Sequence, residues 1–202
     1  MESGTNKINK VVWLCHVNSK TITEKLGVGP SLEFAPWITS FANIFHQKGF
    51  PEIHIISPHK DIIRCKSFKE GNISYYFFPY RIPIVPKRIF NLIHWKTNYW
   101  WNKRKIKNIV SKINPNLIHL FGTENIYFTS AILQFKSLYP VFVTIQGFIN
   151  WIERDSDLTN YNKKIEIDII KNLKHFGIRD DVMKSFIKDR KSTRLNSSHE
   201  SP

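Results

Sequence analysis

The segment from Ile106 to Ile149 constrains the fold of this chain more than any other, because it has the pattern of a β-α-β unit. A helical pattern ends at Asn114-Pro115-Asn116, and the short apolar run Leu117 to Phe121 that follows is typical of a buried strand. A second helical pattern, Ile126 to Leu138, stops before a proline, and the β-branched run Val141 to Ile145 predicts the next strand. Strands that alternate with helices in this way indicate a parallel sheet.

Polar residues follow both predicted strands. Gly122 to Asn125 come directly after the first strand, and Gln146-Gly147 come after the second. Right-handed crossovers place the carboxyl ends of parallel strands at one edge of the sheet, and open α/β sheets bind ligands at that edge. We therefore expect these two loops to lie side by side at a binding site.

The rest of the chain extends the same alternation. The predicted strands are Lys10 to Cys15, Glu52 to Pro58, Ile73 to Phe78 and His175 to Ile178. A loop is expected from His16 to Phe34. The predicted helices are Pro36 to Lys48, a long basic and aromatic stretch that ends at Ile113, and a segment near Lys163 to Leu173. This order predicts an α/β fold with a doubly wound, mostly parallel Rossmann-like sheet and helices on both faces.

The composition is that of one folded domain. The chain has 202 residues, and 42% of them are hydrophobic, which is enough for a sizeable core. It contains no run of about eighteen apolar residues and begins without a basic signal region, so we expect a cytoplasmic location, with peripheral attachment to the inner face of the cytoplasmic membrane as a further expectation. Cys15 and Cys65 lack the spacing of metal ligands, which favours reduced thiols and no metal site.

The positive charge is concentrated in one segment. The formal net charge is +14, and the stretch from Gly71 to Thr123 contains no Asp or Glu. Within it, basic residues alternate with aromatic ones, and the residues we expect at a membrane contact are Lys103, Arg104, Lys105, Lys107, Trp100 and Trp101. An anionic membrane surface is favoured over nucleic acid as the partner of such a helix. The alternative is that the aromatic side chains face the core and the basic face is simply solvated.

The C-terminal residues have a separate origin in our interpretation. Asp189 to His199 resembles, codon for codon, the in-frame translation of a common sequencing-library adapter. We therefore expect one natural domain over residues 1–188, an unstructured tail over residues 189–202, and a longer natural protein interrupted near Lys188.

The candidate site residues come from loops at the predicted carboxyl edge of the sheet. Glu124 and Gln146 are the candidate catalytic residues, and the candidate substrate-binding residues are His16, Gly27, Gly29, His119, Gly122, Asn125 and Gly147. The glycines would let a ligand approach the backbone, and Glu124 suits hydrogen bonding to hydroxyl groups or proton transfer, although a helix-capping role with Thr123 is the alternative. His119 lies inside a strand, so a packed core role competes with substrate binding.

Several segments together resemble a known family. They are Val12 to Cys15, Ala35 to Ile38, His54 to Pro58, Asn114 to Gly122, Pro140 to Phe148 and Phe176 to Arg179. In their order and spacing they resemble the N-terminal half of a family 4 glycosyltransferase with the GT-B fold, of the bacterial surface-polysaccharide type. The resemblance covers Lys10 to Lys188. Many members of that family have histidine at the positions of Phe121 and Gln146, and a Gln amide can still donate and accept hydrogen bonds.

The resemblance implies an activity for a longer protein. Such enzymes have two Rossmann-like domains: the first binds mainly the acceptor, and the second, which carries a paired-glutamate motif, binds the nucleotide sugar. The implied reaction transfers a sugar from a nucleotide-diphosphate sugar to a polysaccharide or lipid-linked acceptor, with retention and without a bound metal. This chain would supply the acceptor half, bind no cofactor, be inactive alone and need the C-terminal donor-binding domain as its partner. The competing hypothesis is a non-catalytic basic Rossmann-like module that binds nucleic acid or anionic lipid.

Overall fold

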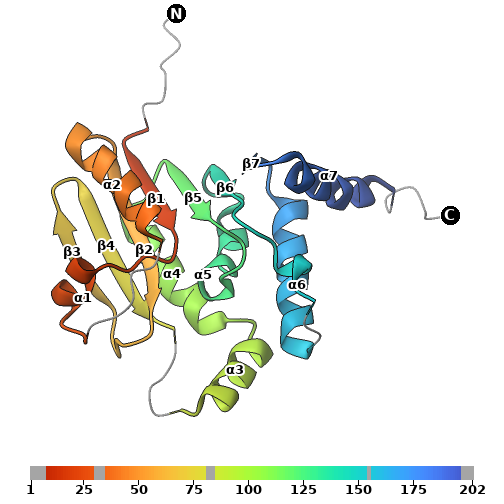
Figure 1. Cartoon of the computed structure of the whole chain (residues 1–202), viewed down its shortest axis with the longest axis horizontal. Helices are drawn as coiled ribbons and strands as arrows, with labels where there is room; N and C mark the ends of the chain where they lie inside the picture. The colour runs from red at the N-terminus through yellow and green to blue at the C-terminus, as the bar shows by residue number, and fades with distance from the viewer. Residues whose placement is uncertain (1–7, 30–34, 81–84, 154–155, 197–202) are drawn as a thin grey trace, which may run out of the picture.

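The computed structural model describes residues 8–29, 35–80, 85–153 and 156–196. A single seven-stranded sheet has the order β3-β4-β2-β1-β5-β6-β7, and only the β3–β4 pair is antiparallel among the described strands. The strands are β1 (Lys10–Leu14), β2 (Glu52–His59), β3 (Lys66–Glu70), β4 (Ile73–Pro79), β5 (Leu117–Phe121), β6 (Val141–Thr144) and β7 (His175–Gly177). The order reverses between β2 and β5, with β1 in the centre (Figure 1).

The central strand is buried on both faces, which is why it is almost wholly apolar. Val12 and Leu14 of β1 belong to one hydrophobic cluster, whereas Val11 and Trp13 belong to the other. This follows from the two-residue period of a strand, which sends successive side chains to opposite faces.

Helices cover both faces of the sheet. Residues of α1 (Lys20–Leu26) and α2 (Pro36–Lys48) pack in the Trp13 cluster. The Leu14 cluster contains residues of α4 (Trp100–Ile113), α5 (Ile126–Thr129), the 3-10 helix η1 (Ile132–Phe135), α6 (Asp157–Asn172) and α7 (Asp181–Asn196). The fold is therefore the doubly wound, mostly parallel Rossmann-like sheet that the sequence predicts.

Most predicted strands are confirmed, and β5 has the predicted bounds. One strand was missed. The segment Lys66–Glu70 pairs with β4 as an antiparallel edge strand joined through a turn at Gly71. Four of its five residues are polar or charged, so it lacks the apolar alternation of a half-buried strand.

The expected loop from His16 to Phe34 is wrong in its first part, since Lys20–Leu26 forms α1. Ser19 caps this helix by accepting a hydrogen bond from the Ile22 N–H at 3.3 Å, and Ile22 and Leu26 are buried one helical turn apart. Residues 30–34 of that expected loop lie outside the described residues.

The expected long basic and aromatic helix is two helices, α3 (Lys87–Lys96) and α4. The break falls at Asn98 and Tyr99, both of which have left-handed backbone conformations. Tyr99 is buried, and its hydroxyl donates to Asn162 Oδ1 at 3.0 Å. Tertiary packing of this ring therefore overrides the continuous helical pattern of the sequence.

The expected helix from Ile126 to Leu138 is likewise two short pieces, α5 and η1. Thr129 and Ser130 end α5, and both are buried. Hydroxyl-bearing residues are poor in helix interiors, and the segment is buried on nearly every side, so packing decides its conformation.

The helix expected near Lys163 to Leu173 begins earlier, at Asp157, where Ser156 accepts a hydrogen bond from the Thr159 N–H at 3.2 Å. The 3-10 helix η2 (Ile149–Trp151) lies between β6 and α6.

The expected unstructured tail is corrected for residues 189–196, because α7 continues to Asn196. Met183 and Ile187 anchor this helix in the core, and no Gly or Pro interrupts the residues that follow. Residues 197–202 lie outside the described part of the chain.

Candidate functional site

Three loops meet where the strand order reverses. His16 follows β1, Gly122 to Asn125 follow β5, and Gln146-Gly147 follow β6. These three strands are adjacent and parallel, so their carboxyl ends lie at one edge of the sheet. The sheet topology thus creates the crevice at which open α/β folds bind ligands.

A cavity of about 240 Å³ opens at this edge. It is lined by four of the candidate residues, His16, Glu124, Asn125 and Gln146, together with Ala35, Ile38, Phe121 and Phe128. Ala35 and Ile38 come from the start of α2, so the N-terminus of that helix also borders the cavity. Residues more than a hundred positions apart in the sequence are therefore brought together.

The Glu124 carboxylate lies over the backbone of two candidate glycines. A Cβ on Gly122 would collide with Glu124 Oε2, and a Cβ on Gly147 would lie 2.9 Å from Glu124 Oε1. Gly122 also has φ +77°, a conformation that side chains other than glycine rarely adopt. The sequence predicted that these glycines admit a ligand to the backbone, but in the structure it is Glu124 that takes the space.

This position shifts the proton affinity of Glu124. Burial of the carboxyl group raises its pKa, and the charge of Glu166 raises it further. Hydrogen bonds from the backbone N–H groups of Glu124, Thr123 and Gly147 act in the opposite direction and limit the rise. Although the Glu124 residue is solvent-exposed, its carboxylate is held by backbone contacts and is a stronger base than an ordinary glutamate.

Asn125 links the β5 loop to the β1 loop. Its Oδ1 accepts a hydrogen bond from the Tyr127 N–H at 3.3 Å, and its Nδ2 lies 3.4 Å from His16 Nδ1. An amide nitrogen only donates, so His16 Nδ1 is the acceptor and the neutral imidazole carries its proton on Nε2. Burial, aided by the neighbouring His59, lowers the pKa of His16 to about 4, so the ring is neutral at pH 7.

Glu166 of α6 is a key residue of the site that sequence reasoning missed. Its carboxylate is fully buried and accepts four hydrogen bonds: from Thr123 Oγ1 at 2.5 Å, Ile149 N at 3.0 Å, Asn150 N at 2.9 Å and Asn150 Nδ2 at 2.7 Å. It therefore joins the loop after β5 to the loop after β6. The available signal was an acidic residue between apolar positions on the buried face of a helix.

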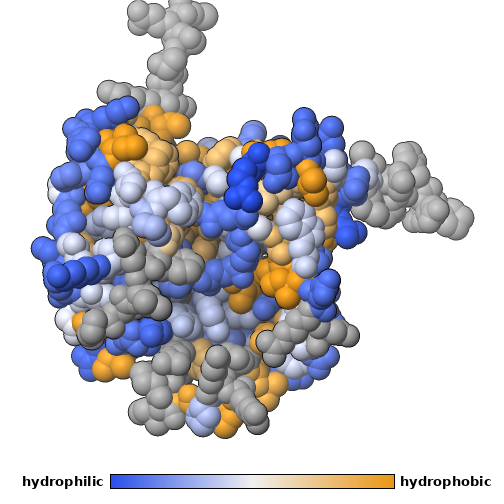
Figure 2. Space-filling model, in the orientation of Figure 1, coloured by the Kyte–Doolittle hydropathy of each residue, from blue (hydrophilic) through white to orange (hydrophobic). Residues whose placement is uncertain are grey.

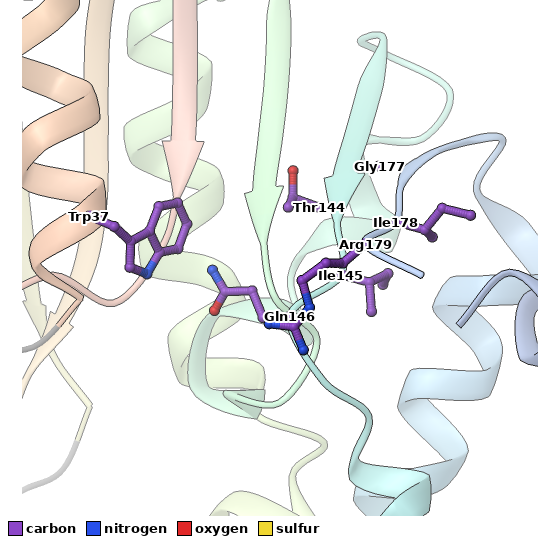
Figure 3. Close-up of a pocket in the computed structure, with 7 residues that line it drawn as sticks. All are labelled: Trp37, Thr144, Ile145, Gln146, Gly177, Ile178 and Arg179. Carbon is purple, nitrogen blue, oxygen red and sulfur yellow. The ribbon is translucent and has the colours of Figure 1, made fainter. Parts of the chain in front are cut away.

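A second cavity of about 560 Å³ adjoins the first, since Gln146 lines both. Its other lining residues are Trp37, Thr144, Ile145, Gly177, Ile178 and Arg179. Figure 3 shows the Trp37 indole extending from α2 toward the Gln146 amide, with Arg179 on the opposite side. Neither Trp37 nor Arg179 was among the predicted site residues. An exposed tryptophan at a helix start could have pointed to the former.

Three candidates lie elsewhere. Gly27 closes α1 in a left-handed conformation, and neither Gly27 nor Gly29 lines the two cavities described above. His119 stacks on Phe121 with ring centroids 3.8 Å apart, and its Nε2 lies 2.7 Å from Thr144 Oγ1. Burial lowers the pKa of His119 to about 4, as expected of a packed neutral ring.

The predicted membrane-contact residues divide into two groups. Lys103 donates to Asn98 Oδ1 and Lys105 to the Pro79 carbonyl, each at 2.8 Å, and burial lowers the pKa of both amines. Arg104, Lys107, Trp100 and Trp101 are exposed. The guanidinium of Arg104 lies 5.3 Å from the centroid of the Trp100 ring.

The two cavities bring together side chains of several chemical kinds. Among the described residues, the lining includes neutral amide and imidazole groups, the Glu124 carboxylate of raised basicity, the exposed Trp37 indole and the Arg179 cation. Groups that both donate and accept suit sugar hydroxyls, and a flat aromatic face suits the C–H face of a sugar ring. Among the described residues, no group of three His, Cys, Asp or Glu side chains could hold a metal ion.

The fold places the chain in a known structural class. No protein-family model and no curated protein sequence matches it. The solved structures that are similar include a sucrose-phosphate synthase from Thermosynechococcus elongatus, with a TM-score of 0.57 and 9% identity over 90% of this chain and 45% of that one. They also include a UDP-forming α,α-trehalose-phosphate synthase from Burkholderia vietnamiensis, with a TM-score of 0.53 and 9% identity over 92% of this chain and 43% of that one. The chain thus spans less than half of each. At this identity the similarity shows the fold alone, and it supports the predicted GT-B glycosyltransferase fold.

Proposed function

We propose that this chain is the acceptor-side domain of a glycosyltransferase of family 4, of the bacterial polysaccharide type. The longer enzyme transfers a sugar from a nucleotide-diphosphate sugar to a polysaccharide or lipid-linked acceptor. The observation that carries the proposal is the cleft at the reversal of strand order, where Gln146 joins the cavity bordered by Glu124 to the cavity bordered by Trp37. The fold that holds this cleft is shared with a little less than half of a sucrose-phosphate synthase and of a trehalose-phosphate synthase.

The geometry suggests a role for each of these side chains. Glu124 accepts a hydrogen bond or the proton from the attacking hydroxyl of the acceptor, because its raised pKa makes it the stronger base of the cleft. Gln146 lines both cavities and orients the sugar through its amide. Trp37 supplies the stacking face, and neutral His16 adds a donor at Nε2.

The domain that binds the donor lies outside this chain in the proposal. The transition state of sugar transfer carries developing charge on the departing diphosphate, and the groups that stabilise it belong to that second domain. The present chain alone is therefore expected to show no transfer.

A decisive experiment uses the enzyme extended with its donor-binding domain. Transfer from a panel of nucleotide sugars to lipid-linked acceptors is measured for the parent, for Glu124→Gln and for the matched control Glu24→Gln, which changes an exposed glutamate on α1. Glu124→Gln keeps the side-chain shape and removes the base, so turnover should fall about a hundredfold or more, whereas the control should retain parental turnover.

The present chain serves as the baseline of this assay. Transfer by this chain alone would contradict the half-enzyme proposal. Parental turnover in a folded Glu124→Gln enzyme would instead reduce Glu124 to a structural role, while leaving the assignment of the domain intact.

A further inference from the structure

Helix α3 presents an apolar face that the described protein does not cover. Phe90 and His94, four residues apart, face inward and are buried. Ile89, Leu92 and Ile93 of the same helix remain 47% to 51% exposed. Spacings of three and four residues place them in one stripe, which is the pattern of an amphipathic helix with an unoccupied apolar side.

Two exposed tryptophans follow α3 in the sequence. Trp100 and Trp101 begin α4, which is separated from α3 by three residues. They are 51% and 50% exposed, and their ring centroids lie 5.7 Å apart. We call the set Ile89, Leu92, Ile93, Trp100 and Trp101 the α3 face. Figure 2 shows hydrophobic surface at the lower end of the molecule, where Figure 1 places α3.

Cations accompany the α3 face. The Lys96 ammonium lies 4.8 Å from the Trp95 ring centroid, and Arg104 and Lys105 lie over Trp100 and Trp101 at 5.3 Å and 5.4 Å. The surrounding sequence from Gly71 to Thr123 has no acidic residue to oppose them. Exposed tryptophans with cations beside them are characteristic of groups that settle at the headgroup level of a lipid bilayer.

A series of side-chain contacts connects α3 to the candidate cleft. His94 Nε2 lies 3.0 Å from the carbonyl oxygen of Tyr80, which directly follows β4, so α3 is fixed at the carboxyl end of the sheet. The Tyr80 ring packs on Tyr127 at 4.4 Å, and the Tyr127 N–H is held by Asn125 of the cleft. In Figure 1 the parallel strands run toward the end of the molecule where α3 lies, whereas β3 runs the opposite way.

We propose that the α3 face docks on the surface of a membrane that contains anionic lipid, with its apolar side chains in the interfacial layer and Arg104 and Lys107 against lipid phosphates. The protein then lies on the membrane rather than across it: no helix among the described residues is long and apolar enough to span a bilayer. Docking by α3 brings the carboxyl edge of the sheet toward the lipid, so that the cleft faces molecules anchored there.

The proposal is tested by sedimentation with vesicles of phosphatidylcholine alone and of phosphatidylcholine mixed with phosphatidylglycerol. The parent should bind the mixed vesicles more tightly, and added salt should weaken that binding. Neutralising Arg104→Gln and Lys107→Gln should reduce the partition coefficient about fivefold for each charge. The control pair Arg64→Gln and Lys48→Gln removes the same exposed charges elsewhere and should have a much smaller effect.

The apolar contribution needs its own variants. The pair Leu92→Ser and Ile93→Ser should weaken binding about tenfold, because each side chain no longer buries its exposed half in lipid. The matched pair Leu138→Ser and Ile63→Ser changes side chains that are 65% and 71% exposed on other segments and should leave binding unchanged. Tryptophan emission of the parent should shift to the blue on binding, and this shift should diminish in Trp100→Phe with Trp101→Phe.

Three results would overturn the proposal. The first is equal binding of the parent to neutral and mixed vesicles, or no binding to either. The second is unchanged binding in the Leu92 and Ile93 variant. The third is binding of RNA or DNA that depends on the same residues in the absence of vesicle binding, since this would assign the surface to nucleic acid.

Discussion

Replacement of Glu166 should disturb the candidate site more than any other change outside the cleft. Its carboxylate is fully buried, and each of its two oxygens accepts two hydrogen bonds. Glu166→Ala leaves the Thr123 hydroxyl, the Ile149 and Asn150 N–H groups and the Asn150 amide without this acceptor. A buried donor that loses its partner costs about 1–3 kcal/mol, and water entering at the partly exposed Asn150 offsets part of the sum. We expect a loss of about 3–5 kcal/mol in the free energy of unfolding.

A second variant separates shape from hydrogen bonding. Glu166→Gln has nearly the same size, but its amide nitrogen is a donor and must face donors that the carboxylate accepted. The expected loss is about 1–3 kcal/mol, smaller than for Glu166→Ala because one oxygen still accepts. Urea unfolding measures both losses as a lower midpoint at unchanged slope.

The matched control for both variants is Glu24→Gln, an exposed change that should stay within about 0.5 kcal/mol of the parent. Losses below about 1 kcal/mol for both Glu166 variants would refute the reasoning. Such a result would mean that the loops after β5 and β6 hold their positions without this carboxylate.

Two further predictions concern the tail and the pH dependence of stability. A chain that ends at Lys188 should lose less than about 1 kcal/mol in the free energy of unfolding, because it keeps the buried Ile187 while it loses the cation–π contacts of Arg190 with Phe186 and of Lys191 with Phe176. A larger loss in urea unfolding would show that the end of α7 is integral to the fold. Burial lowers the pKa of His119 to about 4, whereas a histidine in the unfolded chain has a pKa of about 6.5. Because the unfolded state therefore binds the proton at a higher pH, the folded protein should lose stability as the pH falls from about 6.5 toward about 4. His119→Gln should make this loss shallower, and urea midpoints that fall equally steeply in variant and parent would contradict the assignment.

The sheet could be predicted because its strands carry their own signal. Short β-branched and apolar runs between proline and glycine turns located β1, β2, β4, β5 and β6 within a residue or so. The crossover rule then placed their carboxyl ends at one edge without any knowledge of contacts. The edge strand β3 was missed because its pairing depends on β4 and leaves little hydrophobic pattern of its own.

The helices were predicted less well, because long-range packing decides where several of them break. The basic stretch breaks into two helices at Tyr99, whose ring is buried and whose hydroxyl donates to Asn162, a residue 63 positions later. Thr129 and Ser130 similarly end α5 inside the core. No local periodicity contains this information, since the partner residues lie on other elements.

Some residues of the candidate cleft could be predicted from the sequence, and others could not. Loops that directly follow strands can be located from the sequence, and the four residues predicted there line one cavity: His16, Glu124, Asn125 and Gln146. Trp37 and Glu166 belong to helices that reach the cleft from outside the sheet edge, and only the folded chain reveals their proximity.

The two glutamates of the site have complementary consequences for the proposed reaction. Glu166 is saturated by four donors and has no lone pair directed at the cleft, so its contribution is to hold the loops. Its charge nevertheless raises the pKa of Glu124, whose carboxylate borders the cavity. A residue that fixes the backbone of Thr123 and Asn150 thus also increases the basicity of its neighbour. Loss of Glu166 should therefore weaken the proposed base even where the loops remain folded, because both the position of Glu124 and the field that it experiences depend on the same buried charge.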